Sequence, residues 1–223
     1  MAQAAITPTA RPTHPALPRA LVVLTVVSGF LDAVSYLGLG HVFTANMTGN
    51  VVIIGFAAVG TPGFSVVGSL VSLAAFLAGS VCAGRVELFF HGRAQQNWIR
   101  TVLTAEAVLL AAATVAAFAS APTDLLIALL ALAMGLRNGT VRKLAVPDLT
   151  TTVLTLTLTG LASDSSLAGG TNPRMGRRVV SVVAMLAGAA AGAALVNHQG
   201  LGWPTLIATV LVAGVAIGYR DRH

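Results

Sequence analysis

The chain has 223 residues, of which 56% are hydrophobic and only 9% are charged, and its mean hydropathy is +0.84. In a soluble domain roughly a quarter of the residues are charged. This chain therefore has too few polar groups to cover a surface that faces water. This composition excludes an ordinary soluble globular domain. Because Ala, Val, Leu and Gly dominate, we expect membrane-spanning helices rather than the alternating strands of a barrel.

The net charge of +6 does not indicate a nucleic-acid partner. The basic residues are scattered along short connections, whereas nucleic-acid proteins gather them on one face with interleaved aromatic residues. In a membrane protein, basic residues set the orientation of the helices instead. The single cysteine, Cys82, lies in an apolar run, so the sequence offers neither an intrachain disulfide nor a metal-ligand spacing. We expect no cofactor and no metal.

Apolar stretches divide the chain into spans. Residues 1–19 are rich in proline and polar residues, and we expect a disordered tail there, with a second short tail at 220–223. A spanning helix needs about 20 mainly apolar residues, and six stretches qualify within a single membrane domain over 20–219. These six lie at about 20–40, 66–84, 101–119, 124–141, 179–197 and 203–219.

Two further apolar stretches, 42–60 and 147–163, are interrupted by threonine, asparagine and glycine. They are either full spans, which makes eight helices, or re-entrant segments, which leaves six. Eight spans would divide the thirteen basic residues almost evenly between the two sides, whereas six spans place all thirteen on one side. Cytoplasmic loops are enriched in Lys and Arg, so the sequence favours six spans, two re-entrant segments and cytoplasmic termini in the cell inner membrane.

The two halves of the chain resemble each other. "GFLDAVSYL" from Gly29 aligns with "GLRNGTVRKL" from Gly135, and "AFLAG" (75–79) matches "AMLAG" (184–188). Repeat 1 would cover about 20–119 and repeat 2 about 124–219. Each repeat holds three spans, an odd number, so the second copy is inverted in the membrane. Inverted repeats with helices broken near mid-membrane are typical of transporters, whose substrate sites lie between the repeats.

Small residues four positions apart mark the matching helices of the two repeats. Gly79 and Ala83 form such a pair in the first repeat, and Gly188 and Gly192 form one in the second. This spacing lets helix backbones approach closely. We therefore assign these four residues to helix packing rather than to chemistry.

Two acidic residues lie inside predicted spans rather than at the first or last position of one, and ionisable groups there are expensive and indicate function by default. Asp32 can share a helix face with Ser28 and Ser35. It either couples protons or cations, or accepts hydrogen bonds from the end of a broken helix, and in both cases should face the interior. Glu106 follows Arg100 by six residues, and its long side chain can extend to the membrane interface.

Polar residues crowd both interrupted stretches. In the first, "HVFTANMTGN" (41–50) is expected to cap a broken helix and face a central site. In the second, Asp148 follows Pro147 and is expected to cap a second half-helix, while the threonines of 150–160 fit either an extended piece or a helix stripe. The candidate substrate- or ion-binding residues are Asp32, Ser35, Thr44, Asn46, Thr48, Asn50, Asn138, Asp148, Thr151 and Thr155.

The motifs "GFLDAVSYLGLGHVFTANMTGNVVIIG" and "MGLRNGTVRKLAVPDLTTTVLTLTLTGLASD" resemble those of the YoaK family of small bacterial membrane proteins, over about residues 20–219. The resemblance implies a membrane protein with paired motifs, and because the family has no known function it implies no substrate. Such proteins often read T-G-T where this chain has Leu156 between two threonines, so a glycine hinge is not expected at that position. The positions that the resemblance marks are Asp32, Phe43, Thr44, Asn46, Thr48, Gly49, Asn50, Asn138, Pro147, Asp148, Thr151 and Thr155.

The sequence carries no H-E-x-x-H or G-x-S-x-G motif, and we do not expect an enzyme. We expect a small transporter of a solute or ion, with its site between two inverted repeats. The alternatives are a passive channel on the same scaffold and a non-transporting scaffold or assembly subunit. With about 20 kDa of membrane-embedded chain, a homodimer is also plausible. The residues leave the sign of the substrate's charge open. Hydroxyls bind polar solutes without selecting their charge, the N-termini of half-helices favour anionic groups, and Asp32 favours cations or protons.

Overall fold

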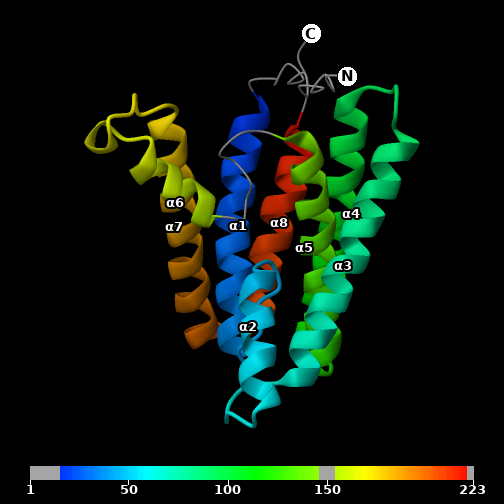
Figure 1. The fold of residues 1–223 in the computed structure, drawn as a ribbon. Helices are drawn as coiled ribbons and strands as arrows, with labels where there is room; N and C mark the ends of the chain where they lie inside the picture. Colours follow the sequence, from blue (N-terminus) through cyan, green and yellow to red (C-terminus); the bar gives the residue numbers. More distant parts are fainter. Residues whose placement is uncertain (1–15, 146–153, 220–223) are drawn as a thin grey trace, which may run out of the picture.

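The computed structural model describes residues 16–145 and 154–219, which form eight α-helices, one short 3-10 helix and no β-strand (Figure 1). The all-helical class predicted from composition is therefore confirmed. In chain order the helices are α1 (Ala16–Gly38), α2 (Met47–Ala58), α3 (Val66–Phe89), α4 (Gln95–Phe118), α5 (Thr123–Leu144), α6 (Leu154–Ser163), η1 (Ser166–Ala168), α7 (Met175–Gln199) and α8 (Gly202–Gly218).

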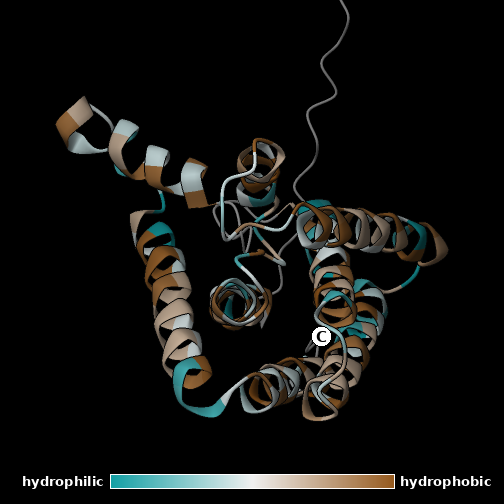
Figure 2. Cartoon of the chain, turned by 90° about the horizontal axis from the view of Figure 1, so that it is seen from below, coloured by the Kyte–Doolittle hydropathy of each residue, from teal (hydrophilic) through white to brown (hydrophobic). Residues whose placement is uncertain are grey.

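Six long helices alternate in direction along the chain, and each overlaps one of the six predicted spans (Figure 1). Five of them, α1, α3, α4, α5 and α7, are long and apolar enough to cross a membrane. Helix α8 has 17 residues, about 26 Å at 1.5 Å per residue, slightly less than the bilayer core of roughly 30 Å. Hydrophobic residues predominate along the long helices when the bundle is viewed from below (Figure 2).

Several helices extend beyond the predicted spans into polar sequence. Helix α4 begins at Gln95 rather than near residue 101, and α7 begins at Met175 rather than near 179. Hydropathy locates the segment that faces lipid, whereas a helix continues for as long as its backbone hydrogen bonds do.

The interrupted stretches form the two short helices. Helix α2 has 12 residues and α6 has 10 described residues, which correspond to about 18 and 15 Å. The described part of neither stretch is long enough to cross a bilayer core. Helix α6 lies toward the end of the bundle where α1 begins and α8 ends, whereas α2 lies toward the opposite end (Figure 1).

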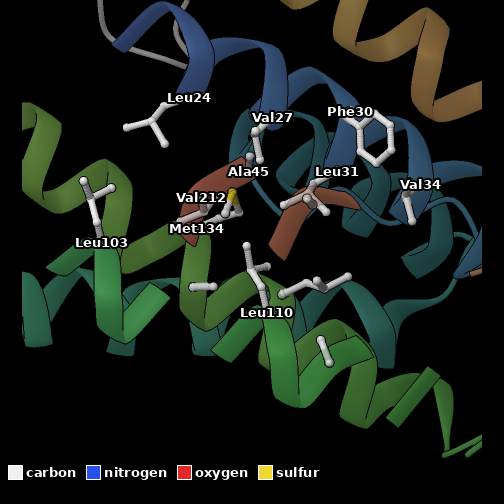
Figure 3. Packing of buried hydrophobic residues seen from close by; sticks show 14 of the residues in the cluster. Leu24, Val27, Phe30, Leu31, Val34, Ala45, Leu103, Leu110, Met134 and Val212 are labelled. Carbon is white, nitrogen blue, oxygen red and sulfur yellow. The ribbon is translucent and has the colours of Figure 1, made fainter. Parts of the chain in front are cut away.

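The core of the bundle lies between α1, α4, α5 and α8. Leu31, Leu110, Met134 and Val212 each come from a different one of these helices, and all four are fully buried (Figure 3). Helices α3 and α7 lie outside this core, α3 packed on α5 and α7 packed on α1. The four central helices therefore form a support, and α2 and α6 pack on the outer helices, α2 on α3 and α6 on α7.

The two outer contacts are close because glycines remove side chains from them. A Cβ added at Gly29 of α1 would overlap the carbonyl oxygen of Met185 on α7, and one at Gly135 of α5 would overlap that of Phe76 on α3. The four residues assigned to helix packing lie in the same two contacts. Gly79 faces the backbone of Leu132, Gly188 faces that of Val26, Gly192 faces that of Phe30, and Ala83 is fully buried near Gly139.

Candidate functional site

A cavity of about 1090 Å³ lies among the helices that flank the core. Its lining comes from α1, α2, α3, α5, α6 and α7, and therefore from both halves of the chain. The first turns of both short helices contribute to it: Met47, Thr48 and Gly49 from α2, and Leu154 and Thr155 from α6. From this cavity the two short helices run to opposite ends of the bundle (Figure 1).

Four of the predicted site residues line this cavity. They come from four places in the sequence: the turn before α2, the first turn of α2, the second half of α5 and the first turn of α6. They are Asn46, Thr48, Asn138 and Thr155. Asn46 makes no side-chain cap to the helix that follows it. Amide and hydroxyl groups of this kind bind polar solutes through hydrogen bonds.

Asp32, by contrast, lies behind the cavity wall. Its side chain is 6% exposed, in the interior as expected for an acid within a span. Its Oδ1 accepts hydrogen bonds from the backbone N–H groups of Thr44 (3.2 Å) and Ala45 (2.8 Å). The geometry therefore matches the structural alternative, in which the carboxylate holds the chain that leads into a broken helix.

Three further predicted site residues, Ser35, Thr44 and Asn50, are also fully buried and support the same turn. The Asn50 amide bonds both backbone groups of Phe43, accepting from its N–H at 2.8 Å and donating to its carbonyl at 2.6 Å. The hydroxyl of Ser72 on α3 donates to that carbonyl at 2.7 Å. The Thr44 hydroxyl lies 3.4 Å from that of Ser35. These side chains position the start of α2, and none of them lines the cavity.

The second short helix is held by an arginine. Arg178 of α7 donates to the carbonyl of Gly160 at 2.5 Å and pairs with Asp164 at 2.8 Å. Within α6, the hydroxyl of Thr159 donates to the carbonyl of Thr155 one turn earlier, so these threonines are helical. The other two predicted site residues, Asp148 and Thr151, lie outside the described residues.

One buried polar feature was missed at the sequence level. Glu106 of α4 and Arg137 of α5 form an ion pair, with side chains 0% and 1% exposed. Arg137 also donates to the carbonyl of Leu24 (2.9 Å) and to the hydroxyl of Ser28 (3.1 Å) on α1. The expectation that Glu106 extends to the interface is wrong, because Arg137 provides a partner in the interior. The signal was available, since Arg137 falls inside the predicted span 124–141 and a charge there needs a counter-charge.

The charges on the cavity wall are basic. Arg142 and Lys143 line the cavity, and no described Asp or Glu does so. Lys143 also lies 3.5 Å from Glu87 and is half exposed. Among the described residues, no three His, Cys, Asp or Glu side chains are grouped closely enough to hold a metal ion. The arrangement can therefore bind a polar or anionic solute through amides, hydroxyls and two cations.

Comparison with known proteins places the chain in a family. A family model described as "Protein of unknown function (DUF1275)" matches residues 20–218. The UPF0700 transmembrane protein YoaK of Bacillus subtilis (strain 168) is 36% identical over 152 residues, which cover 66% of each chain. No solved structure matches the chain. Together with its long apolar helices, the relative identifies a multi-pass transmembrane protein, and the chain belongs to the DUF1275 family.

Proposed function

We propose that this protein is a small inner-membrane transporter of a solute, built from two inverted repeats with the transport site between them. The observation that carries the proposal is the convergence of two short helices on one cavity. Helices α2 and α6 begin there and run toward opposite ends of the bundle (Figure 1). Many secondary transporters bind substrate between discontinuous helices of inverted repeats.

The close helix contacts support the inverted repeat. Gly29 and Gly135 are 106 positions apart in the aligned motifs, and the carbonyls that they approach, Met185 and Phe76, are 109 positions apart in the matched segments. Gly79 and Gly188 likewise approach Leu132 and Val26, again a pair 106 positions apart. These contacts all join one half of the chain to the other, and each of the four has a counterpart in which the roles of the two halves are exchanged.

In this proposal six helices span the membrane, α8 being the sixth, and both termini are cytoplasmic. The described basic residues other than Arg137 support this orientation, because they lie on helices or connections toward the end of the bundle where α1 begins and α8 ends (Figure 1). Cytoplasmic loops carry the excess of Lys and Arg. These residues are Arg19, Arg85, Arg93, Arg100, Arg142, Lys143, Arg174, Arg177 and Arg178.

The residues divide into contact and support groups. Asn46, Thr48, Asn138 and Thr155 contact the solute from the cavity wall. Asp32 and Asn50 hold the turn before α2, and Arg178 holds the far end of α6. Helices α2 and α6 then act as gates on opposite sides, and the closely packed helix pairs move as units about the site.

Cysteine labelling tests the topology. Cys82 is first replaced by serine, because it is exposed. Single cysteines then replace Val59, 82% exposed after α2, and Leu167, 99% exposed in η1. We expect a membrane-impermeant thiol reagent to label Val59→Cys only from outside and Leu167→Cys only from the cytoplasm. Labelling of both from the cytoplasmic side would restore eight spans and remove the inverted repeat.

A second pair of cysteines tests alternating access. Thr48 and Thr155 line the same cavity from the two short helices. In a transporter each of Thr48→Cys and Thr155→Cys should react with the reagent applied from either side, because the site opens to both sides in turn. Reaction from one side only, at both positions, would contradict transport and favour the scaffold alternative.

A further inference from the structure

We propose that the solute is an amphiphilic organic anion: an acidic head group, carboxylate, sulfonate or phosphonate, on an apolar body. This inference rests on the proposed function, since it names the substrate class of the same cavity. The observation that carries it is the uneven charge of the cavity wall, which combines two basic residues with no described carboxylate.

Arg142 supplies the positive charge that remains available. Lys143 shares its charge with Glu87 at 3.5 Å, whereas no carboxylate among the described residues pairs with Arg142. Arginine binds carboxylate, sulfonate and phosphonate oxygens through a planar fork of N–H donors. The head group is therefore expected near the last turn of α5, on the cytoplasmic side of the site.

Asp32, whose negative charge favours a cationic solute, does not line this cavity. Asp32 is absent from the cavity lining, and its Oδ1 is occupied by the N–H groups of Thr44 and Ala45. A cationic solute would therefore meet Arg142 and Lys143 on a wall to which no described carboxylate contributes, and like charges repel each other. The N-terminal ends of α2 and α6, which carry partial positive charge, add to the preference for an anion.

Most of the remaining wall is apolar, which favours an apolar body on the solute. Met47, Ile53, Phe76, Leu158 and Met185 line the cavity, and methionine and aromatic side chains adapt to apolar groups of varied shape. A volume of about 1090 Å³ far exceeds that of a small inorganic ion. Ligand sites with mostly apolar walls and a few placed polar groups bind amphiphilic molecules.

A series of three probes with one aromatic body tests the charge preference: benzenesulfonate as the permanent anion, benzenesulfonamide as the neutral analogue and benzyltrimethylammonium as the permanent cation. Binding to the full-length protein in lipid nanodiscs is measured by titration calorimetry. We expect benzenesulfonate to bind at least roughly tenfold more tightly than the other two, since a charge-assisted hydrogen bond contributes on the order of one decade in affinity.

Two variants locate the head group. Arg142→Gln should weaken benzenesulfonate binding by about tenfold and leave benzenesulfonamide unchanged. Arg85→Gln is the matched control, because Arg85 is an exposed basic residue toward the same end of the bundle and does not line the cavity. Equal binding of the three probes, preference for the cation, no binding of any probe, or equal weakening by both variants would overturn the inference.

Uptake into proteoliposomes separates this inference from the proposed function. Counterflow of labelled benzenesulfonate that is lost in Arg142→Gln supports both. Binding of benzenesulfonate without any flux would support the anion site and overturn the transporter. Linear flux without counterflow would identify a channel that selects anions. Counterflow of benzyltrimethylammonium alone would support the proposal that the protein is a transporter and overturn the inference that its solute is an anion.

Discussion

Among the described residues, two carboxylates are buried in the helical bundle, and the protein accommodates them in different ways. Asp32 on α1 accepts two backbone N–H groups from a turn in the same half of the chain. Glu106 on α4 pairs with the guanidinium of Arg137 on α5, which also reaches α1. The first acid fixes the entry to a short helix, whereas the second connects three helices of the core and joins the two halves.

This difference has energetic consequences. When a side chain that accepts hydrogen bonds from backbone N–H groups is removed, those N–H groups lose their partner. A buried N–H group without a partner costs about 1–3 kcal/mol of stability. A group that pairs with a buried ion leaves a full charge unpaired, which costs about 3–5 kcal/mol. The two acids should therefore respond to substitution by clearly different amounts.

The largest effect is expected at the core ion pair. Arg137→Met leaves the Glu106 carboxylate, which is 0% exposed, without its counter-charge, and should lower the free energy of unfolding by about 3–5 kcal/mol. Denaturant unfolding in detergent micelles measures this change. The double variant Glu106→Leu with Arg137→Met removes both charges and should recover most of the loss. A double variant as unstable as the single one would show that the helix contacts, and not the charge, are at fault.

A smaller effect is expected at Asp32. Asp32→Ala leaves the N–H groups of Thr44 and Ala45 without their acceptor and should lower the free energy of unfolding by about 1–3 kcal/mol. Asp32→Asn keeps an oxygen acceptor at the same place and should lose less. The same unfolding assay compares the two variants. If Asn and Ala are equally damaging, the negative charge itself is needed, and the coupling role of Asp32 returns.

The same two acids show what the sequence can and cannot predict. The position of Asp32 within an apolar span was enough to predict an interior location, and the polar cluster after it predicted a broken helix. The partner of Glu106 was not predicted, because Arg137 is 31 positions away and was counted with the cytoplasmic charges. Hydropathy predicts which residues lie in a span, but the packing of the helices determines which of those residues contact one another.

The candidate site was predicted as a region more accurately than residue by residue. The interrupted stretches did supply the cavity lining, through Asn46, Thr48 and Thr155. Thr44 and Asn50 come from the same cluster, yet both side chains are buried: the Thr44 hydroxyl bonds Ser35 of α1, and the Asn50 amide bonds the backbone of Phe43 in the turn. A polar residue near a helix start can either bind a solute or satisfy the backbone, and the choice depends on side-chain directions that spacing does not reveal.

Asn50 is a neutral buried side chain whose removal can be compared with that of the two buried acids. Asn50→Ala removes the acceptor for the N–H of Phe43, while Ser72 still donates to the Phe43 carbonyl at 2.7 Å. With only one backbone group left unpaired, we expect a loss of about 1–2 kcal/mol, below that of Asp32→Ala. Thermal unfolding of the two variants and of Ser72→Ala ranks them. A larger loss in Asn50→Ala than in Asp32→Ala would mean that the amide, and not the carboxylate, is the main support of α2.

The smallest effect is expected at an ion pair of the same chemical kind in a different environment. Lys143 and Glu87 join α5 to α3 at 3.5 Å, as Arg137 and Glu106 join α5 to α4, but the lysine side chain is 51% exposed. Exposed pairs contribute only about 0–1 kcal/mol because water solvates both partners when they separate. Glu87→Gln should therefore change the free energy of unfolding by less than about 1 kcal/mol. The unfolding assay used for Arg137→Met measures the loss in free energy of unfolding for both variants under the same condition. The difference between the two losses then gives the effect of burial on the strength of an ion pair. A loss at Glu87 as large as that at Arg137 would show that the pairing of helices, rather than the exclusion of water, sets the strength of both contacts.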